Sequence, residues 1–203
     1  MLRVGLTGGL ASGKSSVGRI LSDLGCLLIR ADDLGHEVLE PQGEAYAAVV
    51  ALFGAEILNP DRTINRRALG ARAFADQALL ESLNALVHPA VRARAHALAD
   101  AHFREHPHGI AVYEAAILVE TGSYKDFDRL LVAVCRPEQQ IERAMARDGL
   151  TREEVLDRLK RQIPLDEKVK YADYVIDTSG TKEHTAAQTR QVYESLRTLA
   201  QRP

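Results

Sequence analysis

The sequence predicts an α/β protein in which a parallel sheet is flanked by helices. Two observations support this fold class. Five short apolar runs are separated by helical stretches, and none of the runs alternates strictly between polar and apolar residues, as is typical of strands covered on both faces. Strands separated by helices form parallel sheets with right-handed crossovers. The expected strands are residues 3–7, 26–30, 110–114, 129–135 and 174–177.

Two of the expected helices accompany these core strands. The first, residues 16–24, carries apolar side chains at helical spacing, and Gly25 is placed to end it. The last, about residues 182–201, has Val192, Leu196 and Leu199 on one side. The core is therefore expected to comprise about residues 1–40, 108–136 and 171–203 of a single unit.

Residues from about 41 to 107 interrupt the alternation of strands and helices. The stretch is rich in Ala, Leu and Arg, and its apolar residues recur at helical spacing over 46–53, 79–87 and 89–103. Pro89 is placed to open the last of these helices. We therefore predict a helical insertion between the second and third strands.

A second helical insertion is expected at about residues 137–170. Pro137 lies where it can open a helix, and Gly149 lies where it can end one. Thr151 and Glu154 have the spacing of a capping box, which begins another helix. That second helix is expected to bury a stripe formed by Leu156, Leu159 and Ile163.

The composition excludes several classes of protein. A formal net charge of −2 excludes a broad basic surface for nucleic acids or membranes, and no apolar run reaches the roughly 18 residues of a membrane span. Cys26 and Cys135 lie in apolar runs and are expected to be buried thiols in a reducing compartment. We expect a cytoplasmic monomer with no nucleic-acid or membrane partner.

Residues 8–15, GGLASGKS, match the pattern G-x-x-x-x-G-K-[ST] in full and lie between a predicted strand and a predicted helix. In this setting glycines let backbone N–H groups converge on phosphate oxygens, and the helix N-terminus adds positive potential. Lys14 would reach the β and γ phosphates, and the Ser15 hydroxyl would bind Mg²⁺. The motif predicts a nucleotide site, because a tight glycine turn alone leaves Lys14 and Ser15 unexplained.

Acidic residues near strand ends indicate where the phosphoryl group goes. No N-K-x-D string for reading guanine occurs, and ligands of open α/β sheets collect at the C-terminal ends of strands. Asp32, just beyond the second strand, would orient an acceptor hydroxyl or take its proton, unless it caps a helix. Glu114, which ends the third strand, would assist Mg²⁺ through water, unless it faces solvent. This arrangement favours a small-molecule kinase.

The arginines of the second insertion indicate that this insertion forms a lid covering the phosphates of the nucleotide. Arg143 and Arg147 are four residues apart on one helical face, and Arg158 and Arg161 follow. Like charges at this spacing repel each other unless an anion compensates them. We predict a phosphate-gripping lid, with Asp148 as the compensating charge when no ligand is bound. A plain solvated face is the alternative.

Ordered stretches along almost the whole chain resemble the dephospho-coenzyme A kinase family. They are GLTGGLASGKSS, IRADDLGHEV, INRRALGARAF, LNALVHPAVR, EAAILVETG, RAMARDGLTREEVLDRLKRQIPLDEK and YADYVIDTSG. The resemblance implies a P-loop kinase core with a five-stranded parallel sheet flanked by helices. It also implies a helical acceptor-binding insertion at about residues 41–107 and a helical lid at about residues 137–170. The implied reaction transfers the γ-phosphoryl group of ATP, with Mg²⁺, to the ribose 3′-hydroxyl of dephospho-coenzyme A (dephospho-CoA), the last step of coenzyme A synthesis.

The resemblance also assigns site residues by position. Asp32 would be the acceptor-activating carboxylate, and Arg147 would reach ATP from the lid. His88 would lie in the acceptor domain, where a helix-start turn at His88-Pro89 is an equally good explanation. The implied catalytic set is Lys14, Asp32 and Arg147. The residues assigned to ATP are Gly8, Ala11, Ser12, Gly13, Lys14, Ser15, Ser16 and Arg147; those assigned to the acceptor are Asp32, His88 and Glu114; and those assigned to Mg²⁺ are Ser15 and Glu114.

Two positions depart from the family pattern. The usual Asp-Ala-Asp after the second strand is Arg30-Ala31-Asp32 here. Side chains two apart on a strand share a face, so Arg30 is expected beside Asp32, where it would favour the ionised carboxylate. Near the end of the family pattern, Thr178 stands where the family usually has Asn. The loop is still expected to lie beside the adenine of ATP, because its backbone groups can contact the base.

Two other functions stay open at this point. A kinase for another small acceptor, such as a nucleoside monophosphate, would share the loop and the lid and differ in the insertion at 41–107. A regulatory module that binds nucleotide without catalysis would explain the replacement by Arg30. Against the second alternative stands the joint retention of Lys14, Ser15, Asp32, Glu114 and Arg147.

Overall fold

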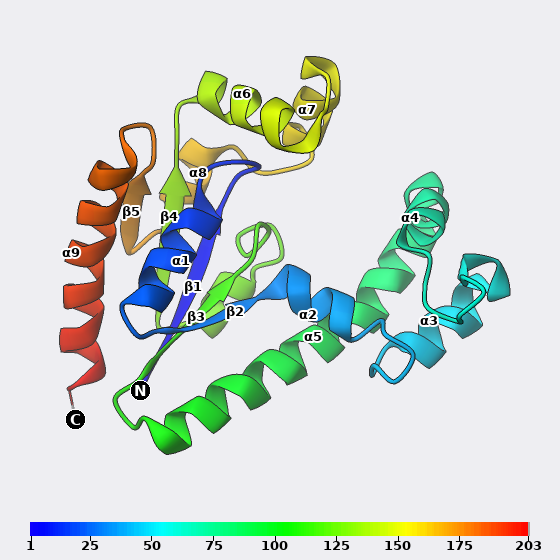
Figure 1. Ribbon diagram of the computed structural model, residues 1–203, viewed down its shortest axis with the longest axis horizontal. Helices are drawn as coiled ribbons and strands as arrows, with labels where there is room; N and C mark the ends of the chain where they lie inside the picture. The colour runs from blue at the N-terminus through cyan, green and yellow to red at the C-terminus, as the bar shows by residue number, and fades with distance from the viewer. Residues whose placement is uncertain (203) are drawn as a thin grey trace. The chain divides into compact units, whose positions relative to one another are not determined.

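The computed structural model describes residues 1–202. Within that range, five strands form one sheet in the order β2-β3-β1-β4-β5. Strand β1 pairs in parallel with both β3 and β4, and β4 pairs in parallel with β5. The predicted α/β fold with a parallel sheet is confirmed (Figure 1). The strands are β1 Leu2–Gly8, β2 Leu27–Arg30, β3 Ile110–Glu114, β4 Arg129–Val134 and β5 Tyr174–Asp177.

The register of the sheet brings the end of β3 next to the end of β1. Leu6 of β1 is paired with Glu114 of β3 on one side and with Leu131 of β4 on the other. Glu114 is the last residue of its strand, whereas β1 continues to Gly8. Because parallel strands end at the same edge of a sheet, Glu114 is placed beside the segment that follows β1.

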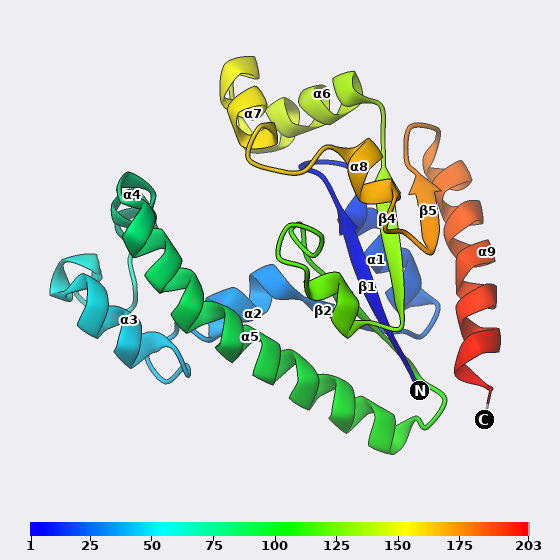
Figure 2. The same cartoon turned by 180° about the vertical axis from the view of Figure 1, so that it is seen from behind.

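Helices α1 (Lys14–Asp23) and α9 (Lys182–Ala200) pack together against the sheet (Figures 1 and 2). Helix α1 contributes Val17 and Leu21 to the core and α9 contributes Leu196, and all three side chains are fully buried. Val192 and Leu199 pack beside them, as predicted. Burying side chains of this size stabilises the fold by about 1.5–3 kcal/mol each.

Residues 137–170, which we call the lid, contain the helices α6 (Pro137–Asp148), α7 (Arg152–Leu159) and α8 (Leu165–Val169). As predicted, α6 ends at Gly149, which adopts the left-handed conformation at φ 66°. Thr151 and Glu154 form the predicted capping box at the start of α7. The local sequence signals therefore located these helix ends correctly.

The stripe predicted to be buried on α7 is partly wrong. Leu156 is 36% exposed, whereas Val155 is fully buried. Val155 packs with Ile141 and Ala144 of α6, and Leu159 lies against this cluster. Val155 and Leu159 are four residues apart and share a helical face, so Val155 takes the place predicted for Leu156, while Leu159 lies on the buried face as predicted. Ile163 lies beyond the end of α7.

Residue contacts divide the chain into two compact units. One comprises Met1–Ile29 and the residues from Ala99 onward, including the 3-10 helix η2 (Ser123–Asp126), and the other is Arg30–Leu98. Fully buried Val38, Val49 and Ile57 lie in the core of this second unit. Its helices are α2 Ala31–Glu37, α3 Tyr46–Phe53, η1 Ala55–Ile57 (a 3-10 helix), α4 Arg66–Ala75 and most of α5 Gln77–Glu105.

Helix α5 is continuous over 29 residues and runs through Pro89. The prediction that Pro89 opens a new helix is therefore wrong. A proline inside a helix removes one hydrogen bond and costs about 3 kcal/mol. The helix offsets this cost by burying Val91, Ala95, Ala99 and Phe103, which recur every four residues on one face.

The two cysteines are buried in the protein interior. Cys26 and Cys135 are buried and carry free thiols, as predicted. Burial raises the pKa of Cys26 to about 12, so this thiol is neutral at physiological pH.

Within residues 1–202 no helix combines the length and the apolar character that crossing a membrane requires.

Candidate active site

The phosphate loop leaves β1 and leads directly into α1. Gly13 is the N-cap of α1 and adopts a left-handed conformation at φ 89°, and no side chain caps the helix there. Ala11 also has a positive φ, of 54°. Since the first N–H groups of a helix have no acceptor within it, they and the helix dipole favour an anion at this end. Lys14, the first residue of α1, belongs to the same end of the helix.

Two glycines of the loop are required by close packing. A Cβ at Gly8 would lie 2.4 Å from Ser12 Oγ and 2.5 Å from the Ala133 carbonyl oxygen. A Cβ at Gly13 would lie 2.7 Å from Thr178 Oγ1. These distances are too short for any side chain, so glycine at both positions lets the loop close around Ser12, which is fully buried.

Ser15 and Glu114, the two residues assigned to Mg²⁺, lie in direct contact. Ser15 Oγ donates a hydrogen bond of 2.6 Å to Glu114 Oε1, and Glu114 is only 6% exposed. Within residues 1–202, no three or more His, Cys, Asp and Glu side chains form a cluster suited to a metal ion. One hydroxyl and one carboxylate nevertheless fit Mg²⁺, because this ion takes few protein ligands in nucleotide sites and completes its coordination with water and phosphate oxygens.

The lid contacts the phosphate loop through a hydrogen bond and through apolar packing. The backbone N–H of Leu10 donates a hydrogen bond of 2.9 Å to Gln162 Oε1. The side chains of Leu10 and Ala11 pack against the lid cluster formed by Ile141, Ala144 and Val155. The tip of the loop is therefore held by the lid.

Arg143 and Arg147, the two arginines predicted to bind one anion, form hydrogen bonds with different residues. Arg143 donates to Thr178 from both terminal nitrogens, at 3.0 Å to Oγ1 and 2.8 Å to the carbonyl oxygen. Arg147 donates two hydrogen bonds to Asp148, of 2.7 and 3.0 Å, and Arg158 lies 3.8 Å from the same carboxylate. These contacts, the Arg147 hydrogen bond first, lower the pKa of Asp148. Asp148 compensates Arg147, as predicted, whereas Arg143 donates to Thr178. The phosphate-gripping role of the two arginines stays a prediction.

Asp32 belongs to the second unit, where it lies in the first turn of α2. The predicted end of the second strand at Arg30 is confirmed, but the expectation that Arg30 and Asp32 share a face, as residues two apart on a strand do, is wrong, because α2 begins at Ala31. Arg30 and Asp32 therefore do not share a strand face. Arg30 Nη1 lies 3.8 Å from Asp33 Oδ2, one turn along the chain. Acidic residues favour the first turn of a helix, which explains why Asp32 and Asp33 begin α2.

His88 lies in the interior of α5, in the second unit, and is exposed. Since α5 runs through Pro89, the helix-start explanation for His88-Pro89 is wrong. Although the residue as a whole is exposed, partial desolvation of the imidazole, and then the charge of Arg92 one turn along the helix, lower the pKa of His88. The imidazole is therefore neutral near pH 7. Its assignment to the acceptor stays a prediction.

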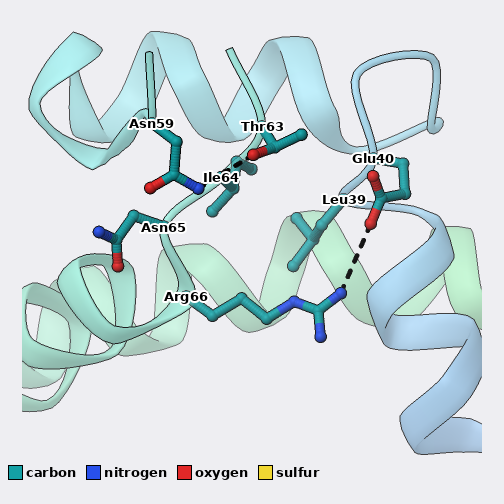
Figure 3. Close-up of a pocket in the computed structure, with 7 residues that line it drawn as sticks. All are labelled: Leu39, Glu40, Asn59, Thr63, Ile64, Asn65 and Arg66. Atoms are coloured by element: carbon teal, nitrogen blue, oxygen red, sulfur yellow. Dashed lines mark hydrogen bonds and ion pairs between the residues drawn. The ribbon is translucent and has the colours of Figure 1, made fainter. Parts of the chain in front are cut away.

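The second unit contains a pocket of about 390 Å³ (Figure 3). Arg66 at the start of α4 extends along it toward Glu40, with Nη2 and Oε1 3.5 Å apart. Asn59 Nδ2 donates a hydrogen bond of 2.9 Å to Thr63 Oγ1 at the same pocket. This pocket was not predictable from the sequence, because its walls come from separate segments that only folding brings together. The lining residues are Leu39, Glu40, Asn59, Thr63, Ile64, Asn65 and Arg66.

Lys168 of α8 is fully buried, which sequence reasoning missed. Its Nζ donates to the Ala116 carbonyl oxygen at 2.7 Å and lies 2.7 Å from Glu120 Oε1. The same Glu120 oxygen accepts a hydrogen bond of 3.1 Å from the Ile163 N–H. Lys168 therefore ties the end of the lid to the segment that follows Glu114. Its charged surroundings in the sequence, LDEKVK, are typical of an exposed turn and gave no signal.

The chain is similar in sequence to known dephospho-CoA kinases. The family model of dephospho-CoA kinase matches residues 2–184. The dephospho-CoA kinase of Geobacter sulfurreducens is 43% identical over 190 residues, which cover 94% of this chain and 96% of that protein. The dephospho-CoA kinase of Thermobifida fusca is 41% identical over 196 residues, which cover 97% of this chain and 96% of that protein.

Solved structures agree with this likeness. A crystal structure from Thermus thermophilus has a TM-score of 0.82 at 30% identity and matches 96% of both chains. The dephospho-CoA kinase from Campylobacter jejuni has a TM-score of 0.71 at 25% identity and matches 97% of both chains. A shikimate kinase from Bacteroides thetaiotaomicron, with a TM-score of 0.52 at 14% identity, shares the fold alone. The chain therefore belongs to the dephospho-CoA kinase family of enzymes, and its fold is that of the P-loop kinases.

Proposed function

We propose that this enzyme transfers the γ-phosphoryl group of ATP to the ribose 3′-hydroxyl of dephospho-CoA, giving coenzyme A and ADP in the last step of coenzyme A synthesis. The observation that carries the proposal is the phosphate loop with Ser15 hydrogen-bonded to Glu114 at 2.6 Å, in a member of the dephospho-CoA kinase family.

The phosphate loop supplies the electrostatic part of the reaction. The bond from the γ-phosphorus to the β–γ bridging oxygen breaks while a bond forms to the acceptor oxygen, and negative charge spreads over the phosphoryl oxygens. Lys14 and the N–H groups around Ser12, Gly13 and Ser16 are proposed to stabilise that charge. Because these donors are already fixed by the fold, they reorganise little during the reaction.

Ser15 and Glu114 are the residues that would hold Mg²⁺. The ion, when bound, neutralises charge on the phosphates of ATP. The contact between the two side chains supports this assignment, because it places two oxygen ligands at one point beside the loop. Glu114 is also assigned to the acceptor side of the site.

The acceptor is assigned to the helical insertion at about residues 41–107, together with Asp32. Asp32 would orient the 3′-hydroxyl and take its proton as the phosphoryl group is transferred. His88, which is neutral near pH 7, offers a hydrogen-bonding group without a charge. The pocket at Arg66 supports an acceptor role for this unit, since amides, a hydroxyl and an ion pair line it.

Arg147 is proposed to reach ATP from the lid. Its hydrogen bonds to Asp148 are exposed, and exposed ion pairs contribute about 0–1 kcal/mol. A multiply charged phosphate is a stronger partner than one carboxylate, so ATP would draw Arg147 away from Asp148. Lid closure then excludes water from the transfer.

A coupled ADP-release assay with several acceptors tests the proposal. Dephospho-CoA should be turned over with a kcat/KM at least 100-fold above those of AMP, CMP and adenosine, each at the same ATP and Mg²⁺ concentrations. Preferred turnover of a nucleoside monophosphate would contradict the proposed acceptor while leaving the kinase mechanism intact. Nucleotide binding without any turnover would point to the regulatory module.

We also propose that the enzyme is a cytoplasmic monomer. Its two free, buried thiols support a reducing compartment. Light scattering coupled to size-exclusion chromatography tests the oligomeric state, and a mass near 22.3 kDa is expected. A mass of twice that value would contradict the monomer.

A further inference from the structure

Thr178, at the end of β5, connects the lid to the phosphate loop. Its hydroxyl accepts a hydrogen bond of 3.0 Å from Arg143 of α6 and donates one of 2.9 Å to the carbonyl oxygen of Ser12. Thr178 is only 5% exposed. A hydroxyl is among the few side-chain groups that can accept and donate a hydrogen bond at one atom, and the Thr178 hydroxyl does both.

The bond to Ser12 determines the direction of a neighbouring donor. In a trans peptide the C=O and the following N–H point in opposite directions, and no cis peptide occurs within residues 1–202. Holding the Ser12 carbonyl toward Thr178 therefore aims the N–H of Gly13 away from Thr178. That N–H belongs to the loop segment that a phosphate would contact.

The side chain of Thr178 also supports Gly13 sterically. A Cβ at Gly13 would lie 2.7 Å from Thr178 Oγ1, 2.8 Å from Cγ2 and 2.9 Å from Cβ. The threonine thus lies directly against the face of Gly13, which keeps the left-handed conformation at φ 89°. The peptide between Ser12 and Gly13 is held by a hydrogen bond at one end and by packing at the other.

We propose that Thr178 is a positioning residue for ATP. It orients the Gly13 N–H toward the phosphates and, through Arg143, couples the position of the lid to that of the loop. This inference rests on the proposed function in one respect, that the loop binds ATP. Thr178 acts through the Ser12–Gly13 peptide and is not itself assigned to contact the reacting atoms.

The test compares Thr178→Val with Thr178→Ser. Valine keeps the shape and removes the hydroxyl, whereas serine keeps the hydroxyl and removes the methyl group. Dissociation constants for a fluorescent ATP analogue with Mg²⁺ are measured without any acceptor, and thermal unfolding is recorded for each variant. The valine variant should bind the analogue about tenfold more weakly, because the Ser12 carbonyl and the Arg143 guanidinium lose a buried partner. The serine variant should bind within about threefold of the parent.

Steady-state kinetics provide a readout that a purely structural role would not move. The KM for ATP should rise in Thr178→Val while the KM for dephospho-CoA stays within about twofold of the parent value. A valine variant that binds the analogue within twofold of the parent would overturn the proposal. Equal losses in the serine and valine variants would also overturn it, since packing and not the hydroxyl would then be responsible.

Arg143→Met keeps the proposal testable if Thr178→Val does not fold. This variant removes both hydrogen bonds from α6 to residue 178 and leaves the bond from Thr178 to Ser12 in place. Nucleotide binding should weaken about threefold, and unchanged binding would contradict the coupling. A parent enzyme that binds the analogue and does not phosphorylate dephospho-CoA would contradict the proposed function alone, because the binding measurements use no acceptor.

Discussion

Ser15 Oγ donates a 2.6 Å hydrogen bond to Glu114 Oε1, although the two residues are 99 positions apart in the sequence. The parallel pairing of β1 with β3 brings them together, because Leu6 and Glu114 are opposite each other in the sheet. The contact joins Ser15, which follows the loop lysine Lys14, to Glu114 at the end of the neighbouring strand β3. It is the structural basis on which we assign Mg²⁺ to this pair.

Glu114→Gln tests that assignment. The amide keeps a hydrogen-bond acceptor for Ser15 and removes the negative charge, so the fold should persist while Mg²⁺ binds less tightly. We expect the Mg²⁺ concentration for half-maximal kcat to rise about tenfold, in line with loss of one charged oxygen ligand. Asp23→Asn, at an exposed carboxylate on α1, is the matched control. An unchanged Mg²⁺ dependence in Glu114→Gln would show that this carboxylate does not serve the metal.

Asp32→Asn tests the acceptor-activating role. If the carboxylate orients the 3′-hydroxyl and takes its proton, kcat should fall by roughly 10²–10⁴. Asp33→Asn provides a close comparison, because Asp33 lies in the same helical turn and pairs with Arg30 at 3.8 Å. That control should lose less than about threefold. If Asp32→Asn retains more than about a third of the parental kcat, Asp32 is not the activating group.

Lys168→Met tests the buried ion pair at the base of the lid. Removing the ammonium leaves Glu120 largely buried without its charged partner, which costs about 3–5 kcal/mol of unfolding free energy. Lys170→Met removes an exposed pair with Glu167 on the same segment and should leave the unfolding free energy nearly unchanged, because solvent screens this pair. Urea unfolding measures both variants. Equal effects of the two substitutions would refute the structural role given to Lys168.

The lid should respond to acid through Asp148. Its folded pKa is lowered, chiefly by the Arg147 hydrogen bond, so its contribution to stability is present above the unfolded value of about 3.9 and is lost as the pH falls through the folded pKa. Asp148→Asn removes that contribution. The parent should therefore lose more unfolding free energy than the variant below about pH 4, by up to about 1 kcal/mol. Parallel pH profiles of the two proteins between pH 6 and pH 3 would contradict this account.

Local signals in the sequence were sufficient for the strands and for several helix ends. The predicted strand Ile110–Glu114 matches the structure residue for residue, and Gly149 and Thr151 mark helix ends where expected. These features depend on hydrophobic runs and capping chemistry, which act over a few residues. The phosphate loop was predictable for the same reason, because its motif is contiguous.

Features that depend on tertiary packing were missed. Pro89 does not interrupt α5, since burial along the helix offsets the lost hydrogen bond. Arg143 donates to Thr178, a partner that only the fold brings near and that the spacing of the arginines did not indicate. Lys168 stands in a charged segment that is typical of a surface turn, yet it is fully buried. In each case long-range contacts outweighed the local pattern.

Phosphoryl transfer to the ribose 3′-hydroxyl can be observed by ³¹P NMR of the reaction with ATP, Mg²⁺ and dephospho-CoA. We predict that a new phosphomonoester signal appears on the ribose 3′-oxygen in step with ADP, one for one, and that Lys14→Ala, which removes the charge held at the phosphates, abolishes both signals while leaving the folded structure intact. Formation of ADP with free phosphate and no 3′-phosphomonoester, or near-parental turnover by Lys14→Ala, would contradict the account.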